Sequence, residues 1–108
     1  MMSPVHLSVI VPAYNEEKRI GRALEEIPAN CRGLGGSYEL LVVDDGSDDK
    51  TADVVRAAAA RDGHIRLISH ARQSGKGAAV KTGVLASAGD LVLFSDADLS
   101  TPIEEFDH

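Results

Sequence analysis

Four short apolar runs recur along the chain, and segments with helical spacing separate them. The runs lie at 5–11, 38–43, 65–68 and 91–94. The second and the fourth are rich in Leu, Val and Phe, as is typical of parallel strands that are covered on both faces. Strands that alternate with helices in this way need right-handed crossovers. The pattern therefore predicts an α/β fold, in which a parallel sheet carries helices on both faces.

Three segments between these runs have the composition and spacing of helices. The first has apolar side chains at i, i+3, i+4 and i+7, and we expect this helix to begin near Asn15. Those side chains are Ile20, Ala23, Leu24 and Ile27. The second helix is expected to begin at Asp49 or Thr51 and to end at Arg61, and the third covers 77–87. The residues of the third helix that we expect to face inward are Ala79, Val80, Gly83 and Val84.

Length and composition exclude several classes of protein. With 108 residues the chain has room for one domain. A net charge of −6, an aromatic content of 4% and the lack of Trp argue against nucleic acid as a partner, because nucleic-acid binders need cationic faces and stacking platforms. Cys31 is the only cysteine, so we expect a free structural thiol in a reducing compartment. No apolar run is long enough to span a bilayer, and we expect a cytoplasmic chain.

Polar clusters follow the ends of three predicted strands. They are Pro12-Ala13-Tyr14-Asn15-Glu16, Asp44-Asp45-Gly46-Ser47-Asp48 and Asp96-Ala97-Asp98. The remaining strand is followed by Ser74-Gly75-Lys76-Gly77 at the head of a helix. Ligands of open parallel sheets bind beyond the carboxyl ends of the strands. We therefore expect all four clusters to lie on one rim around a ligand.

Carboxylates dominate that rim. Asp96 and Asp98 would point to the same side of a strand, about 6.6 Å apart along its axis, so both can bind one divalent cation. Hard oxygen ligands favour Mg²⁺ or Mn²⁺. Asp44 and Asp45 are adjacent at the end of a buried strand and repel each other, and we expect a functional role for at least one of them. Tyr14 is as consistent with the edge of the core as with a site.

Other residues near the rim have simpler explanations. Turn formation and helix capping account for Ser47, Asp48 and Asp49. The histidines lack the spacing of metal ligands, and we expect surface or loop positions for His6, His64, His70 and His108.

Lys76 lies between two glycines at a predicted helix N-terminus, a place that suits a phosphate group. The common phosphate motifs are absent, because His70 stands where a Walker A sequence needs Gly and no G-x-G-x-x-G follows the first strand. A calcium loop from Asp96 fails at Thr101, where Gly is needed. A nucleoside diphosphate bound through a divalent cation fits the remaining features.

Four segments together resemble the family 2 inverting glycosyltransferases. They are 8–16 (SVIVPAYNE), 42–47 (VVDDGS), 75–77 (GKG) and 96–99 (DADL). The resemblance covers nearly the whole chain and implies the GT-A fold, which begins with a Rossmann-like nucleotide-binding half. It implies that 1–108 form the nucleotide-sugar-binding part and stop before the acceptor-binding half. The acceptor-side residues and any catalytic base would then lie beyond this segment, and we expect 1–108 alone to lack turnover.

The same resemblance assigns roles to individual residues. It implies that Asp45, together with Asp44, binds the edge of uracil or guanine, that Asp96 lies near the ribose and the metal, and that Asp98 is the main metal ligand. The nucleoside would be flanked by Pro12, Tyr14 and Glu16. The full donor-nucleotide site that it implies is Pro12, Ala13, Tyr14, Glu16, Asp44, Asp45, Lys76, Asp96 and Ala97.

The segment 96–105 is most similar to the polyprenyl- and dolichyl-phosphate sugar transferases, especially the glucosyl type. Mannosyl members often have Gln at the position of Ser100, so UDP-glucose is favoured as the donor and GDP-mannose is the alternative. The implied acceptor is a lipid phosphate, which is already anionic and needs no strong general base. The full-length protein would then work at the cytoplasmic face of a membrane.

Two alternatives belong to other functional classes. A non-catalytic nucleotide-binding module would have the same rim. A receiver-type signalling domain has a similar size and an acidic rim, but it needs an acidic pair after the first strand and an Asp after the third. Here those positions hold Pro12-Ala13-Tyr14 and Ser69-His70, which argues against it.

Overall fold

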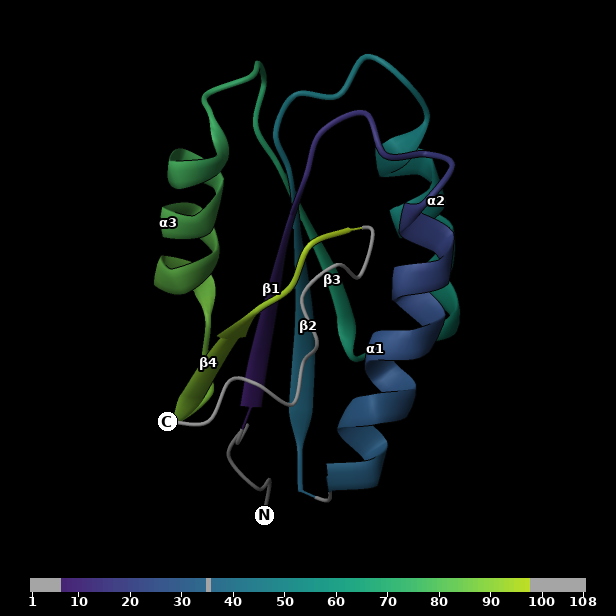
Figure 1. Ribbon diagram of the computed structural model, residues 1–108, viewed down its shortest axis with the longest axis vertical. Helices are drawn as coiled ribbons and strands as arrows, with labels where there is room; N and C mark the ends of the chain where they lie inside the picture. Colours follow the sequence, from purple (N-terminus) through teal and green to yellow (C-terminus); the bar gives the residue numbers. More distant parts are fainter. Residues whose placement is uncertain (1–6, 35, 98–108) are drawn as a thin grey trace.

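The computed structural model describes residues 7–34 and 36–97, which form four strands and three helices in alternation (Figure 1). In chain order the elements are β1 (Leu7–Ala13), α1 (Ile20–Leu34), β2 (Tyr38–Asp44), α2 (Thr51–Arg61), β3 (Ile65–Ser69), α3 (Lys76–Ala86) and β4 (Leu91–Phe94). Every predicted strand and helix is present. The bounds predicted for β4 are those observed.

The four strands form one parallel sheet in the order β3-β2-β1-β4. In Figure 1, α1 and α2 cover one face of the sheet and α3 covers the other. The predicted α/β architecture, with helices on both faces, is therefore confirmed. Because all strands are parallel, their carboxyl ends lie along a single edge.

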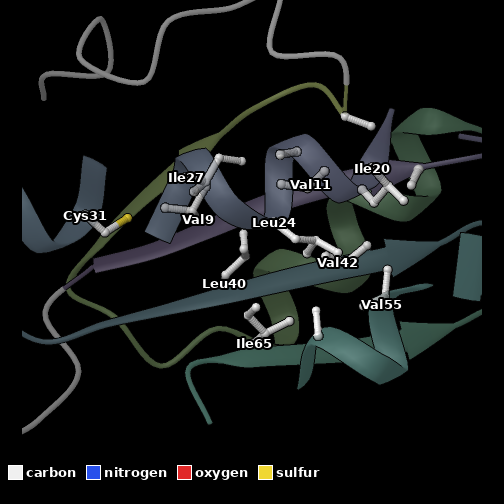
Figure 2. Packing of buried hydrophobic residues seen from close by; sticks show 14 of the residues in the cluster. Val9, Val11, Ile20, Leu24, Ile27, Cys31, Leu40, Val42, Val55 and Ile65 are labelled. Carbon is white, nitrogen blue, oxygen red and sulfur yellow. The ribbon is translucent and has the colours of Figure 1, made fainter. Parts of the chain in front are cut away.

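Alternating side chains of the two central strands supply two apolar layers. Val9, Val11, Leu40 and Val42 belong to the larger cluster, which α1 and α2 complete (Figure 2). Ile10, Leu41 and Val43, which alternate with them along the strands, face the other way and pack with Ala79 of α3. Each such side chain contributes about 1.5–3 kcal/mol when fully buried. The layers therefore fix which face of each strand meets which helix.

Cys31 contributes to the larger cluster and is 1% exposed. Burial raises the pKa of its thiol to about 11, so the side chain stays neutral and behaves as a small apolar group. The free thiol expected from the sequence is found in this buried position.

The two most apolar strands differ in burial, although the sequence predicted the same environment for both. All seven residues of β2 are buried. In β4 only Leu93 is buried, and Phe94 is 37% exposed. Among the strands that the structure describes, β4 lies at the edge of the sheet and pairs with β1 alone. The expectation of a strand covered on both faces is therefore confirmed for β2 and wrong for β4.

Two details of the helices also differ from the prediction. α1 begins at Ile20 rather than near Asn15, because Asn15 has a left-handed backbone (φ 53°) that interrupts a helix. In α3, Ala79 and Gly83 are buried as predicted, whereas Val84 is 41% exposed. The helix meets the sheet through a narrow stripe of small residues, and Val84 lies outside it.

None of the helices in the described part of the chain is long and apolar enough to span a membrane.

Gly83 lets α3 lie close against the sheet. A β-carbon at this position would lie 2.5 Å from Cγ2 of Ile10, which is fully buried and has little room to move. We expect Gly83→Ala to lower the free energy of unfolding by about 1–3 kcal/mol, the usual effect of overpacking. Chemical denaturation measures this change.

Gly21→Ala in α1 is the matched control, since a β-carbon there would have no neighbour within 4 Å. This variant is expected to raise stability by up to about 1 kcal/mol through helix propensity. Equal stabilisation by both substitutions would show that α3 does not lie as close to Ile10 as the structure indicates.

Candidate functional site

A pocket of about 340 Å³ lies at the carboxyl edge of the sheet, within the size range of small-molecule sites. It is lined by Pro12, Ala13, Tyr14, Glu16, Asp45, Gln73, Lys76, Ala79, Asp96 and Ala97. The structure thus brings together every residue predicted for the donor-nucleotide site except Asp44. Gln73 and Ala79 also line the pocket, although the sequence did not predict either of them as a site residue.

Hydrogen bonds between the loops after β1 and β2 shape one side of the pocket. The Asn15 backbone N–H donates to Oγ of Ser47 (2.9 Å), and Oδ1 of Asn15 accepts from the backbone N–H of Asp48 (2.8 Å). The Glu16 N–H donates to Oγ1 of Thr51 at the start of α2 (2.8 Å). These contacts hold the loop that carries Tyr14 and Glu16 against the end of β2.

The adjacent residues Asp44 and Asp45 have different environments. Oδ1 of Asp44 accepts from the backbone N–H of Ser47 (3.2 Å), which closes a turn, and Asp44 is not among the residues that line the pocket. Asp45 lines the pocket and is 3% exposed. Of the predicted pair, the structure therefore places only Asp45 where it can contact a ligand.

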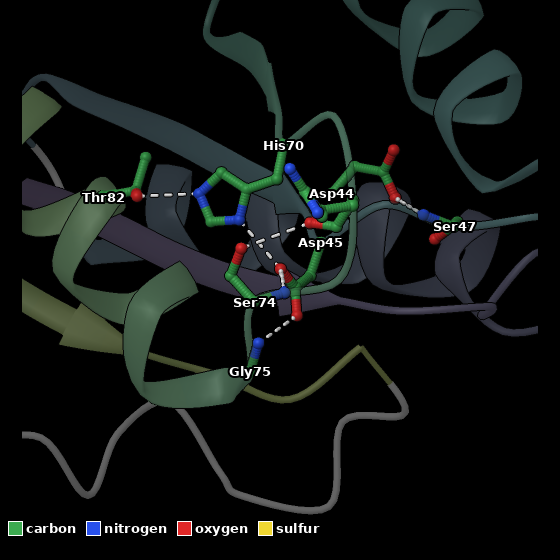
Figure 3. Close-up of polar contacts among 8 residues, drawn as sticks. Asp44, Asp45, Ser47, His70, Ser74, Gly75 and Thr82 are labelled. Atoms are coloured by element: carbon green, nitrogen blue, oxygen red, sulfur yellow. Dashed lines mark hydrogen bonds and ion pairs between the residues drawn. The ribbon is translucent and has the colours of Figure 1, made fainter.

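Asp45 lies at the centre of a hydrogen-bond network (Figure 3). Its Oδ1 is 2.8 Å from Nδ1 of His70 and accepts from the Ser74 N–H (2.9 Å), while Oδ2 accepts from the Gly75 N–H (2.9 Å). Burial acts to raise the pKa of Asp45, but the hydrogen bonds from His70, Ser74 and Gly75 outweigh it and hold the pKa below its usual value. Asp45 is therefore an ionised acceptor at neutral pH.

Gly46 allows the loop after β2 to approach the loop before α3. Its φ is 75°, and a β-carbon would lie 2.4 Å from the carbonyl carbon of Arg72 and 2.5 Å from the nitrogen of Gln73. A side chain at this position would push away the segment that leads to Ser74 and Gly75. Glycine is therefore needed here for Asp45 to reach those two N–H groups.

Lys76 and Asp96 form the other side of the pocket. Nζ of Lys76, the first residue of α3, lies 3.1 Å from Oδ1 of Asp96, just beyond β4. Their side chains are 72% and 35% exposed. A cation at a helix N-terminus can contact phosphate oxygens, and a carboxylate of this kind can bind a hard metal ion.

The predicted metal site is only partly within the described residues. Asp96 lines the pocket, whereas Asp98 lies outside the described residues. Within 7–34 and 36–97, no group of three or more His, Cys, Asp or Glu side chains is arranged to hold a metal ion. The oxygen of Asp96 fits Mg²⁺ or Mn²⁺ chemically, and a complete site would need Asp98 or oxygens of the nucleotide.

The loop position predicted for His70 is confirmed, and the structure adds contacts that the sequence did not predict. His70 lies in the loop after β3, as expected, but its side chain is only 18% exposed and lies between Asp45 and Oγ1 of Thr82 in α3 (Nε2 to Oγ1, 2.8 Å). The sequence signal that could have identified His70 as part of the site is its position directly after a strand, on the rim where ligands bind. His64 is exposed and stacks on Tyr38, with ring centroids 4.2 Å apart. His6 and His108 lie outside the described residues.

Comparison with known proteins identifies relatives over almost the whole chain. The family model described as Glycosyl transferase family 2 matches residues 8–106. A dolichyl-phosphate beta-glucosyltransferase of Trichomonas vaginalis is 43% identical over 97% of this chain and 33% of its own length. An undecaprenyl-phosphate 4-deoxy-4-formamido-L-arabinose transferase of Pseudomonas paraeruginosa is 44% identical over 94% of this chain and 31% of its own. The chain thus spans about a third of the length of these curated relatives.

Solved structures support the same fold. Glucosyl-3-phosphoglycerate synthase from Mycobacterium tuberculosis, in complex with Mn²⁺, UDP and glucosyl-3-phosphoglycerate, has a TM-score of 0.69 and 31% identity over 86% of this chain and 33% of its own. A mannosyltransferase from Pyrobaculum calidifontis, in complex with GDP-Man and Mn²⁺, has a TM-score of 0.66 and 28% identity over 90% of this chain and 30% of its own. The Rossmann-like, GT-A type of fold is therefore confirmed.

Asp45→Asn is expected to destabilise the protein at neutral pH, because an amide replaces a charged acceptor of three N–H groups. The folded-state pKa of Asp45 is lowered, so its stabilising effect is present above the unfolded-state value of about 3.9 and is lost as the pH falls through the folded-state value. The difference in unfolding free energy between wild type and variant should therefore shrink progressively below about pH 4. Urea denaturation from pH 7 downward measures it, and a constant difference would contradict the assignment.

Proposed function

Because the chain belongs to glycosyl transferase family 2, we propose that it holds the donor site of an inverting glycosyltransferase. The donor is a nucleoside diphosphate sugar, with UDP-glucose favoured and GDP-mannose as the alternative. The acceptor is a polyprenyl or dolichyl phosphate. Both relatives described above carry such a lipid phosphate in their names and are transferases, and this supports the assignment.

One observation carries the proposal. The pocket at the carboxyl edge gathers an ionised, hydrogen-bonded carboxylate, a lysine at a helix N-terminus and a second carboxylate from three separate parts of the chain. They are Asp45, Lys76 and Asp96. A nucleotide has a matching order of groups, with N–H donors on the base, a ribose and then a diphosphate. The pocket therefore suits a nucleoside diphosphate better than a neutral ligand.

Each side chain has a separate task in the proposed reaction. Asp45 accepts a hydrogen bond from the base, while Tyr14 and Glu16 border the nucleoside. Lys76 contacts the diphosphate and stabilises the negative charge that develops as it leaves. Asp96 and Asp98 would hold Mg²⁺ or Mn²⁺, which supplies further positive charge to the departing diphosphate. The protein also contributes to catalysis by holding donor and acceptor in line for the displacement.

An anionic lipid phosphate can attack the sugar carbon without a base to remove a proton. A single displacement of this kind inverts the configuration at that carbon. We assign the acceptor-binding residues to the part of the relatives that this chain does not span, so residues 1–108 form the donor half. A lipid acceptor also requires the protein to work at a membrane surface, and the cytoplasmic face remains our prediction.

Lys76→Ala is expected to weaken the binding of UDP-glucose about tenfold, since a charged hydrogen bond to the diphosphate is lost. Lys81→Ala is the matched control, because Lys81 is exposed on the same helix and does not line the pocket. Isothermal titration calorimetry with UDP-glucose and with GDP-mannose, each with and without Mn²⁺, measures both variants. Similar losses in both variants would mean that only the overall charge of α3 matters.

The full-length protein is expected to transfer glucose from UDP-glucose to undecaprenyl phosphate in the presence of Mn²⁺ or Mg²⁺. Asp98→Ala should reduce the rate by about 10²–10³-fold, the usual effect of removing one stabilising group. The control is Asp90→Ala, an exposed carboxylate that does not line the pocket. Residues 1–108 alone should bind nucleotide without turnover, and sugar transfer by this segment would refute the proposed division of the enzyme.

A further inference from the structure

His70 connects the proposed base contact to α3. Its ring lies between the carboxylate of Asp45 and the hydroxyl of Thr82, with both nitrogens at 2.8 Å from an oxygen (Figure 3). The imidazole is mostly enclosed, and its position is fixed from both sides. Such a ring cannot turn without breaking a hydrogen bond, so it holds the Asp45 carboxylate in one orientation.

The network determines which nitrogen of His70 carries the proton. An ionised carboxylate can only accept, so Nδ1 must donate to Asp45. In the neutral ring Nε2 is then an acceptor, and the hydroxyl of Thr82 donates to it. Asp45 therefore selects the tautomer, and Thr82, whose hydroxyl can donate or accept, holds Nε2 in place.

The same bonds limit what Asp45 can do for a ligand. Among the described residues, two donors approach Oδ1 and one approaches Oδ2. An ionised carboxylate has about four acceptor sites, so the remaining capacity lies on Oδ2, beside the pocket that Asp45 lines. Asp45 can thus offer a ligand an acceptor but no donor.

That restriction distinguishes between nucleobases. Uracil and guanine carry a ring N–H on their pairing edge, whereas cytosine and adenine carry a ring nitrogen acceptor there. An acceptor held in one position favours uracil and guanine. With cytosine or adenine, its lone pair would face the lone pair of the ring nitrogen. Without the His70 donor, only the Ser74 and Gly75 N–H groups among the described residues would hold the buried carboxylate, and it could turn its free lone pairs away from the position that selects the base.

We propose that His70 is a positioning residue that sets the base specificity of this site by holding the acceptor oxygens of Asp45 in one orientation at the pocket. This inference rests on the proposed function, because it needs a nucleotide in the pocket. His70 itself need not touch the nucleotide. A substitution of His70 should therefore change the ratio of the affinities for two nucleotides that differ only in the base, and not only the stability of the protein.

Two substitutions of His70 separate its two hydrogen bonds. In His70→Asn the amide nitrogen can take the place of Nδ1 and donate to Asp45, while the contact with Thr82 is lost. In His70→Gln the longer amide reaches the place of Nε2 and Thr82, while the donor to Asp45 is lost. Each variant breaks one of the two bonds, so they should have similar effects on stability, while only His70→Gln should lose base selection.

The experiment uses the full-length protein, with UDP compared to CDP and GDP compared to ADP, in the presence of Mn²⁺. Calorimetry gives each affinity. The wild type should prefer UDP over CDP, or GDP over ADP, by at least about tenfold, as one charged hydrogen bond to the base provides. His70→Asn should keep this preference within about threefold, and His70→Gln should lose most of it.

The results separate a failure of the proposed donor site from a failure of the proposed role of His70. If the wild type binds none of the four nucleotides, the proposed function itself fails. If it binds them without preference, or if His70→Gln keeps the wild-type preference, the role of His70 is refuted while the donor site stands. Should His70→Gln not fold, His70→Phe replaces it: a ring of similar shape without a donor to Asp45 should reduce the preference at least about threefold, and an unchanged ratio refutes the inference.

Discussion

The parallel pairing of β1 with β2 is the constraint on which the site depends. The two strands are in register from Leu7 opposite Tyr38 to Ala13 opposite Asp44, and nearly every residue of both is buried. The N–H of Asp45 extends the pairing by one more bond, to the carbonyl of Ala13 (2.8 Å). Because the strands end together, the polar loops that follow them must meet at one edge, and the pocket forms there.

Two buried carboxylates at the ends of β2 hold α3 from both sides. Asp45 accepts from the N–H groups just before this helix, and Glu39 accepts from the N–H of Ala88 just after it (2.7 Å). Glu39 also accepts from Oγ of Ser8 (2.6 Å) and from Arg66 (3.0 Å). Burial tends to raise the pKa of Glu39, yet these bonds keep it low. Only Ala79 and Gly83 of α3 are fully buried, so polar contacts must position the helix that carries Lys76.

The sequence was sufficient for the features that depend on local patterns. Apolar runs and helical spacing revealed all seven elements, and the polar strand ends predicted most of the pocket lining. Features that depend on neighbours in space were missed. The composition of β4 does not reveal that it lies at an edge, and the spacing of α3 does not show that only its smallest residues meet the sheet. His70 is a loop residue, as predicted, but its contacts were missed because its two partners are 25 and 12 positions away.

The two halves of the pocket differ in rigidity, and this difference suits a donor site. Asp45 is enclosed and fixed by three donors, so the base end is organised before any ligand arrives, which reduces the entropy lost on binding. Lys76 is 72% exposed and Asp96 is 35% exposed, and ion pairs that solvent reaches contribute little to stability. Lys76 can therefore exchange a carboxylate for a diphosphate at small cost. A rigid base contact with an adaptable phosphate contact allows the nucleotide to be selected first and its leaving group to be stabilised afterwards.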